Sequence, residues 1–318
     1  MTLEDFKTEE EYISQMEHGA LLNPRIDSTF KALFTQPTQE SHDALHSFLE
    51  AATERKIKTF ALTANDAPAE FAGQRGVSYD IACVFDDGLA ADIEMQAVNQ
   101  KYDYGKRSEY QVARLETTYL KKGDTWEKAP TVYQITVLDF SYDAACKDVV
   151  SRYAMRTKDG RELSNSLNVI FIDLTKVDGI EGKLDTNSAL ENWAIFLKNA
   201  DNPTKREIIN KLTGKEVGLM QASKSLSSIS ADRDLWFAQY RQEIMERDQL
   251  SSLAAMRREG LEAGRAEGRA EGRAEGRAEA KIETARNYLL LGLSVEQVAK
   301  GSELPLAEVQ QIADTLEK

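Results

Sequence analysis

The chain has 318 residues, of which 42 % are hydrophobic and 29 % are charged, enough to bury one large core or two modest ones. Its net charge of −13 argues against nonspecific coating of nucleic acid, which needs a basic face, but it allows an enzyme that meets DNA through one local basic patch. The two cysteines, Cys83 and Cys146, have no metal-binding spacing, which argues against a zinc finger and against a disulfide scaffold.

The N-terminal segment, MTLEDFKTEEEYISQMEHG, is acidic and lacks the apolar run of a signal peptide. No stretch of the chain has the length that is needed to cross a bilayer. We therefore expect a soluble cytoplasmic protein, in a reducing compartment and without a membrane partner.

Residues 1–200 alternate between strand-like and helix-like segments. Four segments are rich in Val, Ile, Tyr and Phe and are predicted to be strands: 77–85, 90–98, 131–140 and 166–174. Residues 101–123 show helical spacing that Gly123 closes, and 187–200 carries a second apolar helical stripe. This alternation predicts an α/β domain over residues 1–200, with a central mixed sheet flanked by helices.

Two neighbouring strand-like runs each contain one acidic residue, Asp80 in the first and Glu94 in the second. The Asp-Asp-Gly turn at 86–88 joins the runs into a hairpin, and a three-residue loop puts Asp80 opposite Glu94, with Cβ atoms about 5 Å apart. Gln96 then lies on the same face, because side chains alternate along a strand. The opposite face is predicted to join the core through Tyr79, Ile81, Cys83, Ile93 and Met95.

Two carboxylates at this distance repel each other unless one is protonated or a cation lies between them. Oxygen ligands suit Mg²⁺ or Mn²⁺. The spacing Asp-x13-Glu-x-Gln is not specific, however, and a solvent-facing side of the hairpin would explain the acids equally well. The spacing by itself leaves both interpretations open.

Beyond the strands, residues 201–262 are predicted to form a charged helical extension, and a four-residue Gly/Arg/Ala/Glu repeat fills 263–280. Like charges at i,i+4 and a glycine in every turn, each costing about 1 kcal/mol against alanine, predict a poor isolated helix. Two interpretations fit the repeat. It is either a solvated linker or a self-association arm whose Gly/Ala stripe lets a partner approach closely.

Residues 281–318 are predicted to be a small helical module. Ser294 and Gln297 have the spacing of a capping box. The candidate recognition helix, 305–317, contains no Lys or Arg, whereas a DNA reader needs basic or amide groups at that position. A protein-interaction or dimerisation module is therefore favoured over a DNA reader.

Several motifs occur in an order that is seen in one family. NPRIDSTFKALF (23–34) is followed by YDIACVF, ADIEMQ, KRSEYQVARL, TVYQITVLDF, IFIDLTKV and ENWAIFL. In this order they resemble the Rpn family of recombination-promoting nucleases, also described as transposases, in the PD-(D/E)XK superfamily. The resemblance covers roughly residues 20–200 and implies a restriction-endonuclease-like fold. The Glu/Gly/Arg tract and the tail also resemble the ends of such chains.

The resemblance assigns Asp80 to the PD motif and Glu94 to the (D/E)XK motif, where both would ligate Mg²⁺ or Mn²⁺ together with a backbone carbonyl next to Glu94. Gln96 stands where the superfamily usually has a lysine that stabilises the attacking hydroxide and the charged transition state. Glu-Met-Gln is nevertheless typical of this family. Four residues are candidates to supply the missing positive charge: Lys31, Lys101, Lys106 and Arg107.

Asp27 and Lys31 are also candidate catalytic residues, because they lie at i,i+4 if residues 26–34 are helical and their face would then meet the metal site. A helix cap and a surface lysine are the alternative.

Arg107 and Tyr110, at i,i+3, match the family's Arg and Tyr and would bind a phosphate, with ordinary helix packing as the alternative. They share the locally basic window 101–122 with Lys101 and Lys106. Residues 151–161 add further bases, and we expect the two windows to form the DNA-facing side.

We therefore expect a Mg²⁺-dependent or Mn²⁺-dependent DNA endonuclease that acts in recombination, mobile elements or defence. The alternative is a catalytically weak nuclease-fold protein that works as a binding or regulatory module. The expected partners are DNA and a second copy bound through the C-terminal helical arm. A short C-terminal product, started internally near Met245 or Met256, is a further candidate regulator.

Overall fold

The structure is a computed structural model that describes residues 8–67, 75–97, 103–120 and 122–316. The chain divides into two compact units, Met1–Glu246 and Arg247–Lys318, and the division falls within helix α8. The α-helices are α1 (Glu9–Glu17), α2 (Asp27–Thr35), α3 (Gln39–Thr53), α4 (Tyr104–Tyr119), α5 (Ala189–Asn199), α6 (Arg206–Lys215), α7 (Val217–Ile229), α8 (Arg233–Leu290), α9 (Val295–Ser302) and α10 (Leu306–Leu316). Among the described helices, none combines the length and the apolar character that spanning a membrane requires.

The strands are β1 (Phe60–Leu62), β2 (Asp66–Ala67), β3 (Val77–Ser78), β4 (Ile81–Phe85), β5 (Ala90–Gln96), β6 (Val132–Leu138), β7 (Val150–Ala154) and β8 (Leu167–Asp173). Six of them form one sheet in the order β1-β4-β5-β6-β8-β7, and β2 pairs with β3. Strands β5, β6 and β8 are parallel, whereas β1, β4 and β7 pair antiparallel to their neighbours. The sheet is therefore mixed and flanked by helices, as the sequence predicts.

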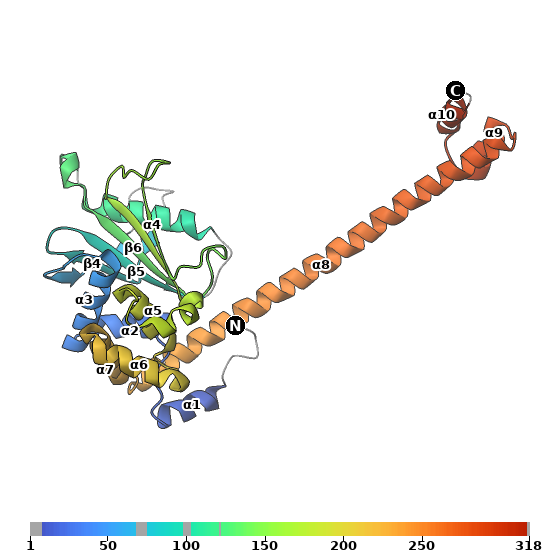
Figure 1. Ribbon diagram of the computed structural model, residues 1–318. Coiled ribbons are helices and arrows are strands. Elements are labelled where there is room, and N and C mark those ends of the chain that lie inside the picture. Colours follow the sequence, from blue (N-terminus) through green and yellow to red (C-terminus); the bar gives the residue numbers. More distant parts are fainter. Residues whose placement is uncertain (1–7, 68–74, 98–102, 121, 317–318) are drawn as a thin grey trace. The chain divides into compact units, whose positions relative to one another are not determined.

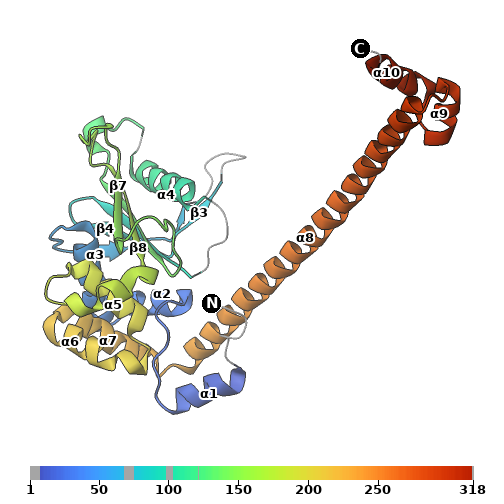
Figure 2. The same cartoon turned by 45° about the vertical axis from the view of Figure 1, so that its right-hand side comes forward.

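Helices cover both faces of this sheet, which is why the parallel strands read as nearly continuous apolar runs. Helix α4 covers one face, and α2, α3, α5, α6 and α7 pack on the other (Figures 1 and 2). Along β5, Ile93 points into the larger core beneath α2, whereas Ala90 points toward α4. Helices α6 and α7 fall in the segment predicted as an extension, yet their buried side chains belong to the same core as the sheet.

Tyr79 is the one predicted core residue of the hairpin that lies on the other face. Its ring packs beneath α4, and its hydroxyl donates to the carbonyl of Gln111 at 3.4 Å. The chain bends at Asp80, so β3 ends at Ser78 and β4 begins only at Ile81. Alternation cannot be counted through a bend, because it holds only along a continuous strand.

The second unit contains the remainder of α8, then α9 and α10. Ser294 and Gln297 form the predicted capping box of α9. A small core of Ala285, Val298 and Val309 holds the three helices together. The repeat at 263–280 is helical and fully exposed. The predicted weakness concerns the isolated segment, whereas here the repeat lengthens an existing helix, which needs no new nucleus, and alanine recurs in every turn.

Candidate active site

The hairpin of β4 and β5 brings the two predicted carboxylates together. Ile81 pairs with Ile93, and the N–H of Phe85 donates to the carbonyl of Leu89 at 2.8 Å, which confirms the predicted register. Asp80 lies just before β4, and its Oδ2 accepts the N–H of Met95 at 3.1 Å. Asp80 is therefore tied to the backbone of the residue that follows Glu94.

Glu94 is almost completely buried on the α4 side of the sheet, with 2 % of its side chain exposed. Its Oε2 lies 3.1 Å from the guanidinium of Arg107 and accepts from Gln96 at 3.3 Å, while its Oε1 accepts from the amide of Gln111. Burial raises the pKa of the Glu94 carboxyl, Arg107 lowers it, and Asp80 raises it again, with a net value of about 7. The Glu94 carboxyl therefore changes its protonation state near neutral pH.

Helix α2 contributes a cation to the same place. Lys31 and Asp27 form the predicted i,i+4 pair at 3.0 Å, and Nζ of Lys31 also lies 3.0 Å from Oδ1 of Asp80. Burial raises the pKa of Asp27, and the nearby Asp80 raises it further, against the opposing effect of Lys31. Burial alone would lower the pKa of Lys31, but the two carboxylates raise it above its ordinary value. The structure therefore brings together all four acidic and basic residues predicted from the two motifs.

Gln96 has the role of a connector in this site. Its Oε1 accepts from the hydroxyl of Tyr104 at 3.3 Å and from Arg107 at 3.4 Å, while its amide donates to Glu94. It carries no charge, but it links Glu94 to the first turn of α4. No function was predicted for Tyr104 or Gln111 from the sequence. Tyr104, Arg107 and Gln111 stand at i, i+3 and i+7, however, and this spacing places all three on one face of the helix.

Asp92 is a fourth acidic residue at the site, in addition to Asp27, Asp80 and Glu94, and it was not predicted from the sequence. It lies two residues before Glu94 on the same face of β5, opposite Ala82 and Gln134, and it is fully buried. Neither of its carboxylate oxygens has a hydrogen-bond partner among the described residues. Burial, followed by the charges of Glu94 and Asp80, raises the pKa of Asp92 well above the ordinary value, which favours its neutral form.

A groove of about 580 Å³ opens along the outer side of α4. Lys106, Arg107 and Tyr110 of the predicted phosphate-binding set line it, and Arg75 lies across from them. The hydroxyl of Tyr110 donates to the carbonyl of Arg75 at 2.8 Å, which joins the two walls. Arg107 and Gln111 line the groove and also contact Glu94, so these two side chains lie between the groove and the buried carboxylate. Lys101, the other predicted member, lies outside the described residues.

In the second basic window, 151–161, three of the four basic residues have an acidic partner, and the fourth, Lys158, is exposed. Arg152 binds Glu54 at 3.0 Å beyond the end of α3, on the face of the sheet opposite α4. Arg156 pairs with Glu162 at 2.6 Å, and Arg161 pairs with Asp159 at 3.0 Å. Pairing lowers the free positive charge of this segment, and its place on the DNA-facing side stays a prediction.

The donor set around Asp80 and Glu94 fits a hard divalent cation, because it consists of carboxylate oxygens with two neighbouring cations, Lys31 and Arg107, that compensate their charge. Among the residues that the structure describes, no three His, Cys, Asp or Glu side chains form a metal-binding group. A divalent ion would therefore need backbone or water oxygens in addition to the two carboxylates.

The comparison with protein families gives one match, to a family described as PD-(D/E)XK nuclease family transposase, over residues 24–255. This span includes every site residue described above and the first turns of α8. It agrees with the motif order seen in the sequence. No curated protein and no solved structure matches the chain.

Proposed function

The chain belongs to the PD-(D/E)XK nuclease family transposases, and on that basis we propose that it is a metal-dependent endonuclease that hydrolyses phosphodiester bonds in DNA. The observation that carries this proposal is the placement of Asp80 and Glu94 side by side, with Lys31 3.0 Å from the first and Arg107 3.1 Å from the second. Paired carboxylates flanked by cations suit a reaction in which charge develops on a phosphate.

Asp80 and Glu94 would hold Mg²⁺ or Mn²⁺, with a backbone carbonyl beside Glu94 as a further ligand. The ion would lower the pKa of a bound water and neutralise charge on the phosphate. Lys31 would stabilise the attacking hydroxide, which is the task of the lysine that Gln96 replaces. Arg107 would stabilise the negative charge of the phosphate, and Gln96 would hold Arg107 and Tyr104 in place beside Glu94.

The groove along α4 is the proposed path of the DNA backbone. Arg75, Lys106 and Arg107 supply positive charge along it, and Tyr110 closes one side. Because the whole chain is acidic, this local charge decides where DNA approaches. Self-association through the C-terminal helices would pair two such sites, which suits cleavage of both strands.

The test is cleavage of supercoiled plasmid by the purified protein with Mg²⁺ or Mn²⁺, compared with Asp80→Asn and Glu94→Gln. We expect metal-dependent nicking or linearisation that both variants lose. Asp86→Asn is the matched control, because Asp86 is an exposed acid in the turn of the same hairpin. Absence of cleavage by folded wild-type protein with either metal would contradict the proposal, and DNA binding without cleavage would then favour a binding or regulatory protein.

A further inference from the structure

The segment that leads into α2 has no capping residue of its own. The N-cap position of α2 is Ile26, whose side chain cannot accept a hydrogen bond. The first N–H groups of a helix have no intrahelical partner, so they need acceptors from elsewhere. This matters for the site because Asp27 is the first residue of α2 and Lys31 follows one turn later.

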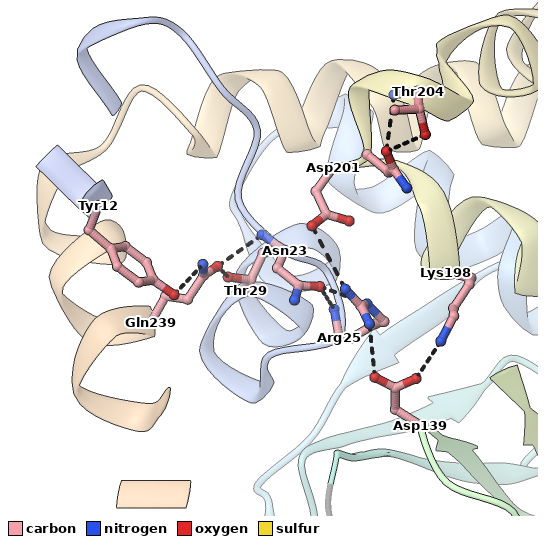
Figure 3. A network of polar contacts seen from close by, with 10 residues as sticks. Tyr12, Asn23, Arg25, Thr29, Asp139, Lys198, Asp201, Thr204 and Gln239 are labelled. Atoms are coloured by element: carbon pink, nitrogen blue, oxygen red, sulfur yellow. Dashed lines mark hydrogen bonds and ion pairs between the residues drawn. The ribbon is translucent and has the colours of Figure 1, made fainter. Parts of the chain in front are cut away.

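Two glutamines near the start of α8 hold this segment, and one of them, Gln242, accepts an N–H from the first turn of α2. Oε1 of Gln242 accepts the N–H of Ser28 at 3.3 Å. Oε1 of Gln239 accepts the N–H of Asn23 at 2.9 Å and the hydroxyl of Thr29 at 3.2 Å (Figure 3). Gln239 is 2 % exposed, and its amide nitrogen donates to the hydroxyl of Tyr12 at 3.3 Å. The start of α8 therefore caps α2 across more than 200 positions of the sequence.

The same segment is held from its other side by the end of β6. Arg25 forms an ion pair with Asp139 at 3.0 Å, and Lys198 binds the second oxygen of Asp139 at the same distance (Figure 3). The N–H of Asp139 donates to the carbonyl of Gln96 at 3.0 Å. The entry to α2 is thus fixed between the edge of the active site and α8.

We propose that Gln239 and Gln242 are positioning residues that set Asp27 and Lys31 against Asp80. They act through α2 and do not touch the site themselves. The part of the proposal that concerns catalysis rests on the proposed nuclease function, because it requires Lys31 to act on the reaction. The matched span of the family, 24–255, includes both glutamines.

The first experiment compares plasmid cleavage by the full chain, Gln242→Leu and Gln249→Leu. Gln249 is an exposed glutamine of the same helix, so its variant controls for the loss of an amide from α8. We expect kcat to fall by about 10- to 100-fold in Gln242→Leu, because a small displacement of a catalytic group costs that much. KM should stay unchanged, because the groove along α4 is untouched. An unchanged kcat, or a rise in KM alone, would overturn the proposal.

Thr29 gives a second variant pair from the α2 side. Thr29→Val keeps the shape of the side chain but loses the hydroxyl that donates to Gln239, whereas Thr29→Ser keeps it. We expect a lower kcat in the valine variant and rescue in the serine variant. Equal kcat values in the two variants would count against a role for this hydrogen bond.

Amide hydrogen exchange separates this proposal from the nuclease proposal. Exchange over residues 26–31 should be faster in Gln242→Leu than in wild type and unchanged in Gln249→Leu. This measurement does not need turnover. If wild-type protein cleaves no DNA, the nuclease function fails, but faster exchange would still support the cap and unchanged exchange would overturn it.

Discussion

The ammonium of Lys31 on α2 lies 3.0 Å from Oδ1 of Asp80, the residue that the family resemblance assigns to the PD motif. In the usual pattern of the superfamily, a lysine two residues after the second acid supplies this charge. Here that position is Gln96, which binds Glu94, Tyr104 and Arg107. The positive charge beside the carboxylates therefore comes from Lys31 on α2 and not from position 96 at the end of β5.

Replacement of Lys31 by Met should therefore abolish most of the cleavage while leaving the carboxylates in place. We expect kcat to fall by about 100-fold or more, as for the loss of one group that stabilises a transition state. Mn²⁺ affinity, measured by calorimetry, should be maintained or increased, because Asp80 loses a competing cation. The exposed Lys56 gives the control variant Lys56→Met. Full cleavage by Lys31→Met would contradict the assignment.

Gln96→Lys restores the usual residue of the superfamily and places an ammonium beside Glu94. Since an adjacent positive charge favours the ionised carboxyl, the pKa of Glu94 should fall from about 7. The acid limb of the pH profile of cleavage should then move to lower pH. Gln96→Met, which adds no charge, should leave that limb in place. Identical profiles for wild type and Gln96→Lys would show that Glu94 does not control the limb.

Stability of the metal-free protein should decrease as the pH rises. The native pKa of Glu94, about 7, exceeds its usual value of 4.5, so the native state holds a proton that the unfolded state has already lost. The stabilisation is complete below about pH 4.5 and is lost as the pH rises through about 7. Thermal melts from pH 5 to 8 should show this fall for wild type and a smaller one for Glu94→Gln. Saturating Mn²⁺ should reverse it, and a melting temperature that rises with pH without metal would contradict it.

Asp92→Asn should stabilise the protein at high pH. The buried Asp92 must hold a proton or leave a charge without a partner, whereas an asparagine is neutral at every pH. Its amide can also donate to the side-chain oxygen of Gln134, its neighbour on β6, which lacks a donor among the described residues. We expect a higher melting temperature than wild type at pH 8 and a smaller difference at pH 5, with Asp86→Asn as the exposed control. A lower melting temperature at pH 8 would contradict a neutral Asp92.

Two contacts of the site, the hairpin register and the ion pair on α2, could be predicted from residues that are close in the sequence. The turn at 86–88 and the alternation of the strands predicted that Ile81 pairs with Ile93. Helical spacing predicted that Asp27 and Lys31 lie next to each other. The family resemblance then singled out Asp80 and Glu94 as the expected metal ligands. The prediction for Tyr79 failed because the bend at Asp80 interrupts the alternation.

Other parts of the site could not be predicted from local patterns. Gln239 and Gln242 cap a helix that lies far away in the sequence, and a glutamine in a charged helix has no local feature that indicates such a partner. The pairing of basic residues in 151–161 could not be predicted for the same reason. Arg152 and Glu54 are far apart in the sequence and form an ion pair only in the folded domain. Strand alternation does place Asp92 on the same face as Glu94. Nothing in the neighbouring sequence indicates, however, that its carboxyl has no hydrogen-bond partner among the described residues.

The cap on α2 also has a consequence for the order of synthesis. Residues 22–29 leave the ribosome early, but their hydrogen-bond acceptors on Ser230, Gln239 and Gln242 are made almost at the end of the first unit. Until those residues emerge, Lys31 lies on a helix whose first turn has no cap. A nascent chain that already contains Asp80 and Glu94 therefore still lacks the contacts that hold the start of α2, and the proposed nuclease site is completed only with the last part of the first unit.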